Sequence, residues 1–462
     1  MRVASRGAAA AVLCLGLLVA GCGGGGGDAT STKADPGGAV TVTVVNGDTR
    51  QPVAGATVVG TRSGQVVATV TSGDDGTAQV PQGTRLVTVT ADGFSNGAHA
   101  VGSAPLDVPV FDPDLQSPEY GGGPARNRYV PAVVAPLPSG NPDWTFESRT
   151  LIEFPPAVDN GLLVFGVNSG RVYGLDAETG AVRWARRQKG EIASSPAISG
   201  NRVFVSSMDG MLSAYGLGGT PRWQFSTSGS PIESSPLVVD GRVFVGAWNG
   251  TLYAVDAETG KAVWTFQAAA DIKGSAALAG GSVVVADYAG NVYALDPATG
   301  AERWRYSGGK RFYGGPAVSG TTLVIGDVGG AVIALNVNTG RELWRHATSG
   351  YVYSSPAIAR GTVFIGSYSG QFEALSLADG SPKWSFNAGE RISGSATVVG
   401  DVVYTAILAK PGTPPKTFGL DTGTGKVRYT GDDGRYSPAV AAGVTLYLVG
   451  TRIIDAYRDP TP

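Results

Sequence analysis

The sequence predicts an all-β protein, an eight-bladed β-propeller preceded by a small β-sandwich domain. A period of 40 residues runs through the chain from about residue 151 onward. Each period holds four short runs of β-branched and aromatic residues separated by turn residues. Four short strands in about 40 residues is the composition of one propeller blade. The chain also has 70 glycines and only 16% charged residues, which suits tight turns better than long solvated helices.

The charge and the side-chain inventory exclude several classes of function. The formal net charge is −2, so the chain has no electrostatic footprint for nucleic acid. The sequence has two cysteines, Cys14 and Cys22, and two histidines, His99 and His346. With so few of these residues, we expect no disulfide, no zinc site of the Cys/His type, no thiol nucleophile and no Ser-His-Asp triad.

Residues 1–21 have the features of a signal peptide. Arg2 and Arg6 precede an apolar run, Ala8 to Ala20, that is too short for a comfortable transmembrane span. The run ends in Leu-Val-Ala-Gly-Cys, which resembles the lipobox of bacterial lipoproteins. The resemblance implies cleavage before Cys22 and lipidation of Cys22 by two or three acyl chains. A plain secretory signal with an incidental cysteine is the alternative.

Two segments precede the repeats. Residues 22–38 are rich in glycine and polar residues, so we expect a flexible tether. Residues 39–111 contain about seven short alternating strands broken by turns, which predicts a β-sandwich. The landmarks at 52–58, 75–77 and 91–94 resemble the carboxypeptidase-regulatory-like domain. That family implies a non-catalytic accessory, acting either as a rigid spacer or as an interaction module.

The repeats occupy residues 143–458, after a linker and lead-in at 112–142. Ser-Ser-Pro recurs at 194–196, 234–236 and 354–356, and weaker copies bring the number of repeats to eight. A large aromatic residue accompanies each copy: Trp144, Trp184, Trp223, Trp264, Trp304, Trp344 and Trp384, with Tyr429 in the seventh blade. Their strict period favours packing between neighbouring blades over ligand stacking.

Trp144 indicates how the ring closes. It precedes the first full copy, whereas the last copy has only three strands before the chain ends. We expect the segment around Trp144 to supply the missing outer strand of the last blade, which removes an exposed sheet edge.

The stretch from Tyr293 to Trp304, Tyr-Ala-Leu-Asp-Pro-Ala-Thr-Gly-Ala-Glu-Arg-Trp, resembles the pyrroloquinoline-quinone (PQQ) repeat. Residues 120–129 are similar to the lead-in that is common before such arrays. Two branches share this repeat. Quinoprotein dehydrogenases bind PQQ and Ca²⁺ over the central axis, and many carry a vicinal disulfide that this chain has no cysteines to form. Scaffold lipoproteins of the BamB type are propellers without known catalysis, and the chain shares their lipobox, blade number and compactness but adds the domain at 39–111.

One face of the propeller is the candidate binding face. The loops between second and third strands, and those leading into the first strands, should share it. They place there the candidate residues Trp248, Tyr288, Tyr368, Asp287 and Asp327 from the first set, and Glu153, Glu233, Lys273, Tyr313, Tyr353 and Arg435 from the second. Three interpretations stay open: local packing around the channel mouth, a surface that binds a protein or a glycan, or a quinone and Ca²⁺ site that uses Asp287 and Asp327.

Together these features predict an extracytoplasmic, lipid-anchored scaffold or binding protein with no enzymatic activity and no cofactor. We expect a monomer on the outer face of a bacterial cell membrane, or on the outer membrane of a diderm host, with an envelope protein or a glycan as partner. The alternatives are a dehydrogenase dependent on PQQ and Ca²⁺, and a structural spacer that displays the small β-domain.

Overall fold

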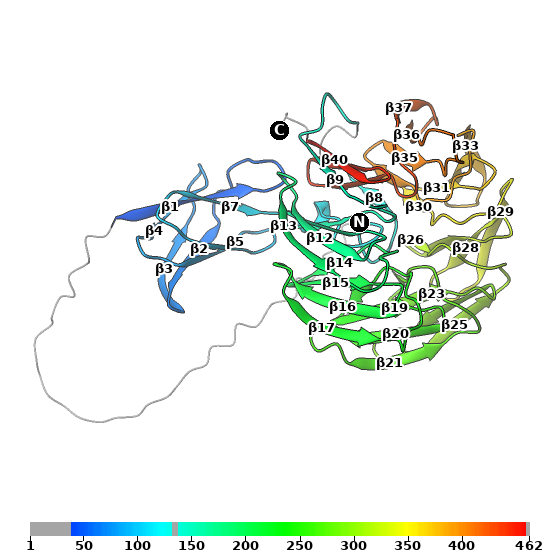
Figure 1. Cartoon of the computed structure of the whole chain (residues 1–462), viewed down its shortest axis with the longest axis horizontal. Helices are drawn as coiled ribbons and strands as arrows, with labels where there is room; N and C mark the ends of the chain where they lie inside the picture. The colour runs from blue at the N-terminus through cyan, green and yellow to red at the C-terminus, as the bar shows by residue number, and fades with distance from the viewer. Residues whose placement is uncertain (1–37, 132–136, 459–462) are drawn as a thin grey trace, which may run out of the picture. The chain divides into compact units, whose positions relative to one another are not determined.

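The computed structural model describes residues 38–131 and 137–458 of the chain, and Figure 1 shows their arrangement. Regular structure in these ranges is β except for one 3₁₀ helix, η1 (Pro113–Leu115), so the predicted all-β class is confirmed. The predicted signal peptide, the tether as far as residue 37 and the lipidation site Cys22 lie outside the described residues. Within the described ranges, no helix has the length and apolar character needed to cross a bilayer.

Residues 39–110 form the small domain, whose two sheets have the strand orders β4-β1-β7 and β3-β2-β5-β6. Its strands are β1 (Ala39–Asn46), β2 (Thr57–Arg62), β3 (Gln65–Thr71), β4 (Thr77–Pro81), β5 (Leu86–Thr90), β6 (Gly97–Ala100) and β7 (Leu106–Val110). Alternate residues of β1, namely Val40, Val42 and Val44, are buried, as the two-residue period of a strand requires. They share one core with Val58 and Val89 of the other sheet, which makes the domain a β-sandwich.

Residues 144–458 supply eight further sheets, each built on four consecutive antiparallel strands or on three completed by an earlier segment. The strands are β9 (Trp144–Glu147), β10 (Ala157–Asp159), β11 (Leu162–Gly166), β12 (Arg171–Asp176), β13 (Val182–Arg187), β14 (Ala197–Ser199), β15 (Arg202–Ser206), β16 (Met211–Gly216), β17 (Pro221–Ser226), β18 (Leu237–Val239), β19 (Arg242–Gly246), β20 (Thr251–Asp256), β21 (Ala262–Gln267), β22 (Ala277–Ala279), β23 (Ser282–Ala286), β24 (Asn291–Leu295), β25 (Glu302–Ser307), β26 (Ala317–Ser319), β27 (Thr322–Gly326), β28 (Ala331–Asn336), β29 (Glu342–Ala347), β30 (Ala357–Ala359), β31 (Thr362–Gly366), β32 (Gln371–Ser376), β33 (Pro382–Asn387), β34 (Thr397–Val399), β35 (Val402–Ala406), β36 (Thr417–Asp421), β37 (Val427–Gly431), β38 (Ala439–Ala442), β39 (Thr445–Val449) and β40 (Ile453–Arg458).

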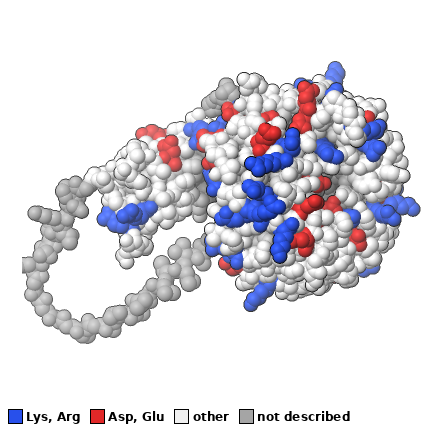
Figure 2. All heavy atoms as spheres, viewed as in Figure 1, with Lys and Arg blue, Asp and Glu red and all other residues white. Residues whose placement is uncertain are grey.

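The eight sheets are arranged as a closed ring (Figure 1). The short first strand of a sheet contacts the first strand of the next sheet, as β10 contacts β14 and β34 contacts β38. The first strand of the last sheet, β38, in turn contacts β10 of the first sheet. Second strands such as β11 are buried along their whole length, whereas fourth strands such as β21 alternate between exposed and half-buried residues. The first strands therefore line the axis, and the fourth strands form the rim. On the face of the molecule in Figure 2, basic and acidic side chains are interspersed among uncharged residues.

The ring closes as the sequence predicts. Strand β9 pairs antiparallel with β40, with Trp144 opposite Ala456 and Glu147 opposite Ile453. The last sheet thus receives its fourth strand from a segment that precedes the first sheet. This exchange leaves neither end of the array with an unpaired strand edge.

The periodic tryptophans pack between neighbouring blades, which confirms the packing interpretation. The indole Nε1 of Trp264 donates to the carbonyl of Pro297 in the next sheet, at 3.1 Å. Trp144 makes the equivalent bond to Ala177, at 3.2 Å, across the closure of the ring. Each indole also covers a turn glycine of the next blade, so that a Cβ added at Gly300 would lie 2.7 Å from the Trp264 ring.

The segment predicted as a linker and lead-in contributes to the centre of the propeller. The backbone of residues 117–128 accepts hydrogen bonds from the middle residue of successive first strands. The pairs, in ring order, are Val158 with Ser117, Ile198 with Pro118, Leu278 with Pro124, Val318 with Ala125, Ile358 with Asn127 and Val398 with Arg128. In the third blade the acceptor is a side chain, because the amide of Val238 donates to the carboxylate of Glu119. The hydroxyl of Ser117 reaches the eighth blade, where it donates to Ala441 at 2.7 Å.

We call residues 117–130 the axial segment. Except for β34, the first strands have no further strand on their axial side, so their free amides need acceptors when they are buried. The axial segment supplies these acceptors, and its last residues form strand β8 (Tyr129–Val130), which pairs in parallel with β34. Much of the region predicted as a linker is therefore an integral part of the propeller.

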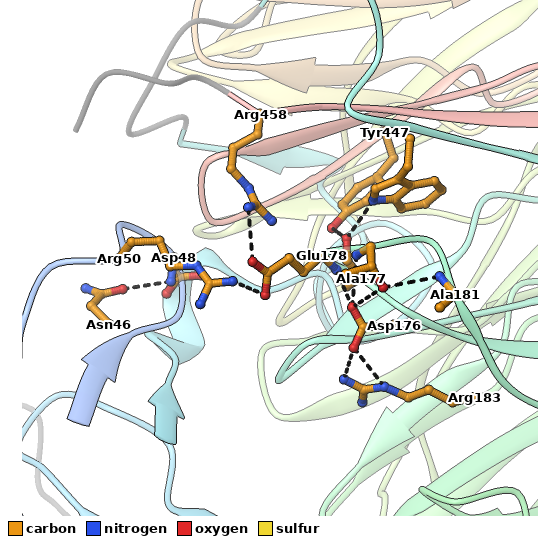
Figure 3. A network of polar contacts seen from close by, with 12 residues as sticks. Asn46, Asp48, Arg50, Asp176, Ala177, Glu178, Ala181, Arg183, Tyr447 and Arg458 are labelled. Atoms are coloured by element: carbon orange, nitrogen blue, oxygen red, sulfur yellow. Dashed lines mark hydrogen bonds and ion pairs between the residues drawn. The ribbon is translucent and has the colours of Figure 1, made fainter. Parts of the chain in front are cut away.

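Polar contacts link the small domain to the first and last blades (Figure 3). Glu178, in the turn after β12, forms ion pairs with both Arg50 and Arg458. The carboxylate of Asp48 accepts from the Asp112 amide at 2.8 Å and from Gln116 Nε2 at 2.9 Å. Burial raises the pKa of Asp48, and the two hydrogen bonds oppose that rise. The contacts join the turn after β1 to residues 112–116, which directly precede the axial segment.

Candidate binding site at the channel mouth

The structure brings two periodic sets of residues to one end of the axis. The loop between the second and third strands of a blade is bonded to the loop that leads into the first strand of the same blade. The amide of Trp248 donates to Pro231 at 3.0 Å, and the amide of Tyr368 donates to Tyr351 at 2.8 Å. Because this bond recurs from blade to blade, side chains that lie 40 residues apart surround one opening, which we call the mouth.

Five aromatic side chains, Trp248, Tyr288, Tyr313, Tyr353 and Tyr368, follow one side of the mouth, and we call them the aromatic arc. Ring centroids are 6.3 Å apart for Tyr288 and Tyr313, 5.2 Å for Tyr313 and Tyr353, and 4.5 Å for Tyr353 and Tyr368. All five residues were among the sequence candidates. The four tyrosines follow one another at the distances of interacting aromatic pairs. Trp248 is joined to them through Lys273, whose ammonium lies near the rings of both Trp248 and Tyr288.

A cation lies against each end of the aromatic arc. The ammonium of Lys273 is 3.8 Å from the centroid of Trp248 and 4.7 Å from that of Tyr288. At the other end, the guanidinium of Arg391 is 5.7 Å from the ring of Tyr368. All three distances fall within the range of cation–π attraction. Lys273 was a sequence candidate, whereas Arg391 was missed, although it lies 40 residues after Tyr351 and so has the same period.

Glu233 is hydrogen-bonded to two members of the aromatic arc. Its carboxylate accepts a hydrogen bond from Trp248 Nε1 at 3.1 Å and another, short one from the hydroxyl of Tyr313. Burial and the nearby Glu233 carboxylate raise the pKa of Tyr313, so this phenol stays protonated and continues to donate. Glu233 is therefore a positioning group of the mouth.

Glu153 is the second carboxylate of the mouth. Burial and the charge of Glu233 raise its pKa to about 7, against the opposing attraction of Arg435. Arg435 itself lies beside the neighbouring Tyr436, with 5.4 Å between the guanidinium carbon and the ring centroid. The mouth thus carries one carboxylate whose charge changes near neutral pH.

A cavity of about 70 Å³ lies inside the mouth. Glu153, Glu233, Lys273, Tyr313 and Tyr353 line it, as predicted. Phe154, Tyr436 and Tyr120 line it too, although they were not among the sequence candidates. Phe154 and Tyr436 each adjoin a residue that the period had identified, whereas Tyr120 comes from the axial segment and carries no periodic signal. Pockets for drug-sized ligands usually measure about 300–1,000 Å³, so this cavity suits a single side chain or a small group.

Asp287 and Asp327 do not belong to the exposed part of this face, which corrects their assignment as candidate binding residues. Their exposed fractions are 0% and 1%. One oxygen of Asp287 accepts from the amides of Ala289 and Asn291, at 3.0 and 2.9 Å, and the other accepts from the hydroxyl of Tyr293 at 2.8 Å. Asp327 accepts in the same way from amides of its own hairpin. Both carboxylates close the turn between the second and third strands.

These contacts bear on a quinone and Ca²⁺ site. Ca²⁺ needs six to eight oxygen ligands that converge. The carboxylate oxygens of the two candidate aspartates are instead bonded to their own hairpins and to the amides of Ala269 and Lys310 in the adjacent loops. The cavity of about 70 Å³ is also small for a tricyclic quinone. In residues 38–131 and 137–458, no group of three or more His, Cys, Asp or Glu side chains could hold a metal ion. The residues present do not fit the PQQ and Ca²⁺ group at this mouth.

Comparison with known proteins agrees with this architecture. A family model described as "Outer membrane protein assembly factor BamB" matches residues 126–234, 217–310 and 288–432. Among solved structures, BamB from Moraxella catarrhalis is 16% identical, covers 70% of this chain and 99% of its own, and superposes with a TM-score of 0.60. The quinohemoprotein alcohol dehydrogenase from Comamonas testosteroni is 14% identical and superposes with a TM-score of 0.63. The match covers 75% of this chain and 82% of the dehydrogenase. A computationally designed protein, Ika8, is 17% identical and superposes with a TM-score of 0.61. The match covers 69% of this chain and 100% of Ika8. No curated protein sequence matches the chain. At these identities, the likeness to solved structures shows the fold alone.

Proposed function

Because the chain belongs to the family of the outer membrane protein assembly factor BamB, we propose that it is a non-enzymatic binding protein of the cell envelope that recognises another protein with its channel mouth. The signal-peptide pattern and the cysteine at position 22 support an extracytoplasmic, lipid-anchored location. The family membership favours a scaffold, and the aromatic arc gives that scaffold a surface on which to bind.

The aromatic arc is the observation that carries this proposal. Tyrosine, tryptophan and arginine are the residues most enriched at binding hot spots, and here they form one continuous row that ends in Arg391. Tyr351, whose carbonyl accepts from Tyr368, is 57% exposed and adds accessible aromatic area beside the arc. The aromatic arc and the exposed Tyr351 together form a rigid apolar surface whose hydroxyl groups can also make hydrogen bonds to a partner.

Site-specific crosslinking in the host tests the proposal. A photoreactive amino acid placed at Tyr351 should yield a covalent adduct with one envelope protein. The same group placed at Val427, which is 47% exposed on the rim strand β37, serves as the matched control and should yield none. Replacing Tyr368 with alanine should lower the adduct about tenfold or more, which corresponds to a hot spot of at least 1.4 kcal/mol.

Three outcomes would contradict the proposal. Equal adducts from the two positions would mean that the mouth has no special affinity, and absence of any adduct would remove the partner. An adduct that is destroyed by glycosidases and survives proteases would identify a glycan instead of a protein.

The alternative function, a dehydrogenase dependent on PQQ and Ca²⁺, has a separate test. The capped carboxylates of Asp287 and Asp327 and the small cavity argue against it. Incubation of the purified protein with PQQ and Ca²⁺ should give no bound-quinone absorbance and no dye reduction with alcohols. A stoichiometric quinone spectrum would revive the enzyme hypothesis.

A further inference from the structure

Two arginines of the axial segment are buried at the centre of the propeller. Arg126 and Arg128 are each 2% exposed, and they are the largest fully buried side chains among the described residues. Both have left-handed backbone conformations, with φ of +55° and +56°. Non-glycine residues adopt this conformation only at an energetic cost, so the fold tolerates strain to place these two side chains.

Arg126 is fully compensated. Its Nε donates to Ala276 at 3.0 Å, its Nη2 donates to Pro236 at 2.8 Å, and its Nη1 donates to Tyr120. Its Nη2 also lies 3.5 Å from a carboxylate oxygen of Glu119, which is buried as well. The charge of Arg126 is therefore matched by one carboxylate and three carbonyl oxygens.

Arg128 has no such compensation. Its Nε and Nη2 are buried and have no hydrogen-bond partner, and no carboxylate of the described residues lies within ion-pair distance of it. Its guanidinium stacks on the ring of Tyr120 at 3.8 Å from the centroid. Burial lowers the pKa of Arg128, yet an arginine in a protein remains protonated. Two buried guanidinium groups thus face a single buried carboxylate, that of Glu119, and one positive charge is left over.

The charge in excess lies beside a small cavity. Arg128 lines a void of about 10 Å³ together with Ser117, Glu119, Gly121 and Thr397. A void of this size holds about one water-sized particle. Glu119 is engaged by Arg126 and by the amide of Val238, so the unpartnered donors at the void are those of Arg128. A halide ion is only slightly larger than a water molecule and requires a small outward shift of the lining side chains, whereas phosphate and carboxylate groups are far larger.

We propose that Arg128 and the surrounding axial segment bind one halide ion, chloride under ordinary conditions, as an internal counter-ion of the propeller. Buried charges in proteins are paired because an isolated one is costly, and a cation–π contact with Tyr120 offsets only part of that cost. A water molecule could accept one hydrogen bond from Arg128, but it would not supply the missing negative charge. The site goes beyond the proposed function, because it is a cavity separate from the mouth cavity, with only Tyr120 lining both, and does not depend on any partner.

Bromide detects such a site directly. Crystals of the protein grown in sodium bromide should show one anomalous peak within hydrogen-bond distance of the Arg128 guanidinium at the bromine edge. In solution, the melting temperature should rise by about 2–3 °C for each tenfold increase in chloride at constant ionic strength, with gluconate as the replacement anion. These two measurements use the unaltered protein.

Two variants sharpen the test. Arg128→Met keeps the length of the side chain and removes the charge, so the dependence on chloride should disappear. Arg360→Met is the matched control, because Arg360 also has positive φ and also stacks on a tyrosine, Tyr129, but it is exposed. This control should keep the dependence. If Arg128→Met fails to fold, the bromide peak and the chloride series of the unaltered protein still decide. Only water at the site, with a melting temperature independent of chloride, would overturn the proposal.

Discussion

Removal of one inter-blade indole tests the physical basis of the ring. Trp264 is half-buried between the third and fourth blades, where its ring lies 5.6 Å from that of Phe244 and covers Gly300. Its Nε1 bond to Pro297 crosses to the next blade. Trp264→Ala removes this bond and opens a cavity at the blade interface. A buried tryptophan costs about 3–5 kcal/mol when truncated, and partial exposure places Trp264 near the lower limit, about 3 kcal/mol.

Two further variants separate the contributions. Trp264→Phe keeps most of the apolar contact and loses the hydrogen bond, so we expect a loss of about 1–2 kcal/mol. Val263→Ala is the matched control, because Val263 is the adjacent residue on the same rim strand and is 45% exposed. Its cost should stay within about 0.5 kcal/mol.

Equilibrium unfolding in guanidinium chloride, followed by far-ultraviolet circular dichroism, measures the three free energies of unfolding. The dichroism signal is suitable because the substitutions themselves alter tryptophan fluorescence. If Trp264→Ala fell within about 1 kcal/mol of Val263→Ala, the indoles would not hold the blades together, and the explanation of the 40-residue period would be wrong.

Two other predictions concern the mouth and the axial segment. The pKa of Glu153 is raised from 4.5 to about 7 in the folded state, so the native protein prefers the protonated carboxyl and loses stability as the pH rises through that interval. Glu153→Gln, which mimics the protonated form, should match the wild type at pH 4.5 and exceed its free energy of unfolding by about 2 kcal/mol at pH 8, a value already reduced for partial exposure. Urea titrations at the two pH values measure this, and a difference that is the same at both would contradict it. For the axial segment, a chain that starts at residue 112 should fold to a cooperative, dichroic β-protein, whereas a chain that starts at residue 132 should not, because the first strands lose their acceptors. Equal cooperativity of the two chains in thermal melts would refute the structural role of the axial segment.

The sequence predicted the features that repeat. The period of 40 residues located the blades, because each blade must bury the same faces against its neighbours. Trp144 predicted the closure of the ring, since a fourth-strand residue without its own blade has to complete another one, and β9 does so with β40. The aromatic arc was also predicted, because loops at one period position share one face.

The features that do not repeat were missed. The axial segment binds the first strands mainly through carbonyl oxygens, which every residue type carries, so its sequence shows no recognisable pattern. Tyr120, which lies beneath the mouth cavity, was missed for the same reason. Asp287 and Asp327 were assigned to the binding face because they adjoin its period position. Each aspartate binds the amides two and four residues after it, which is the spacing of an aspartate that closes a turn. This spacing is visible in the sequence and could have corrected the assignment.

The axial segment has a consequence for the size of the propeller. Its acceptors at residues 117, 118, 119, 124, 125, 127 and 128 follow each other along the chain in the same order as the seven blades that they serve, and the hydroxyl of Ser117 donates to Ala441 of the eighth. The length of the axial segment and the spacing of its acceptors are therefore matched to the number of blades. If one repeat were duplicated, the first strand of the additional blade would find no acceptor in the axial segment. A change in blade number therefore requires a matching change in the axial segment, which lies outside the repeats.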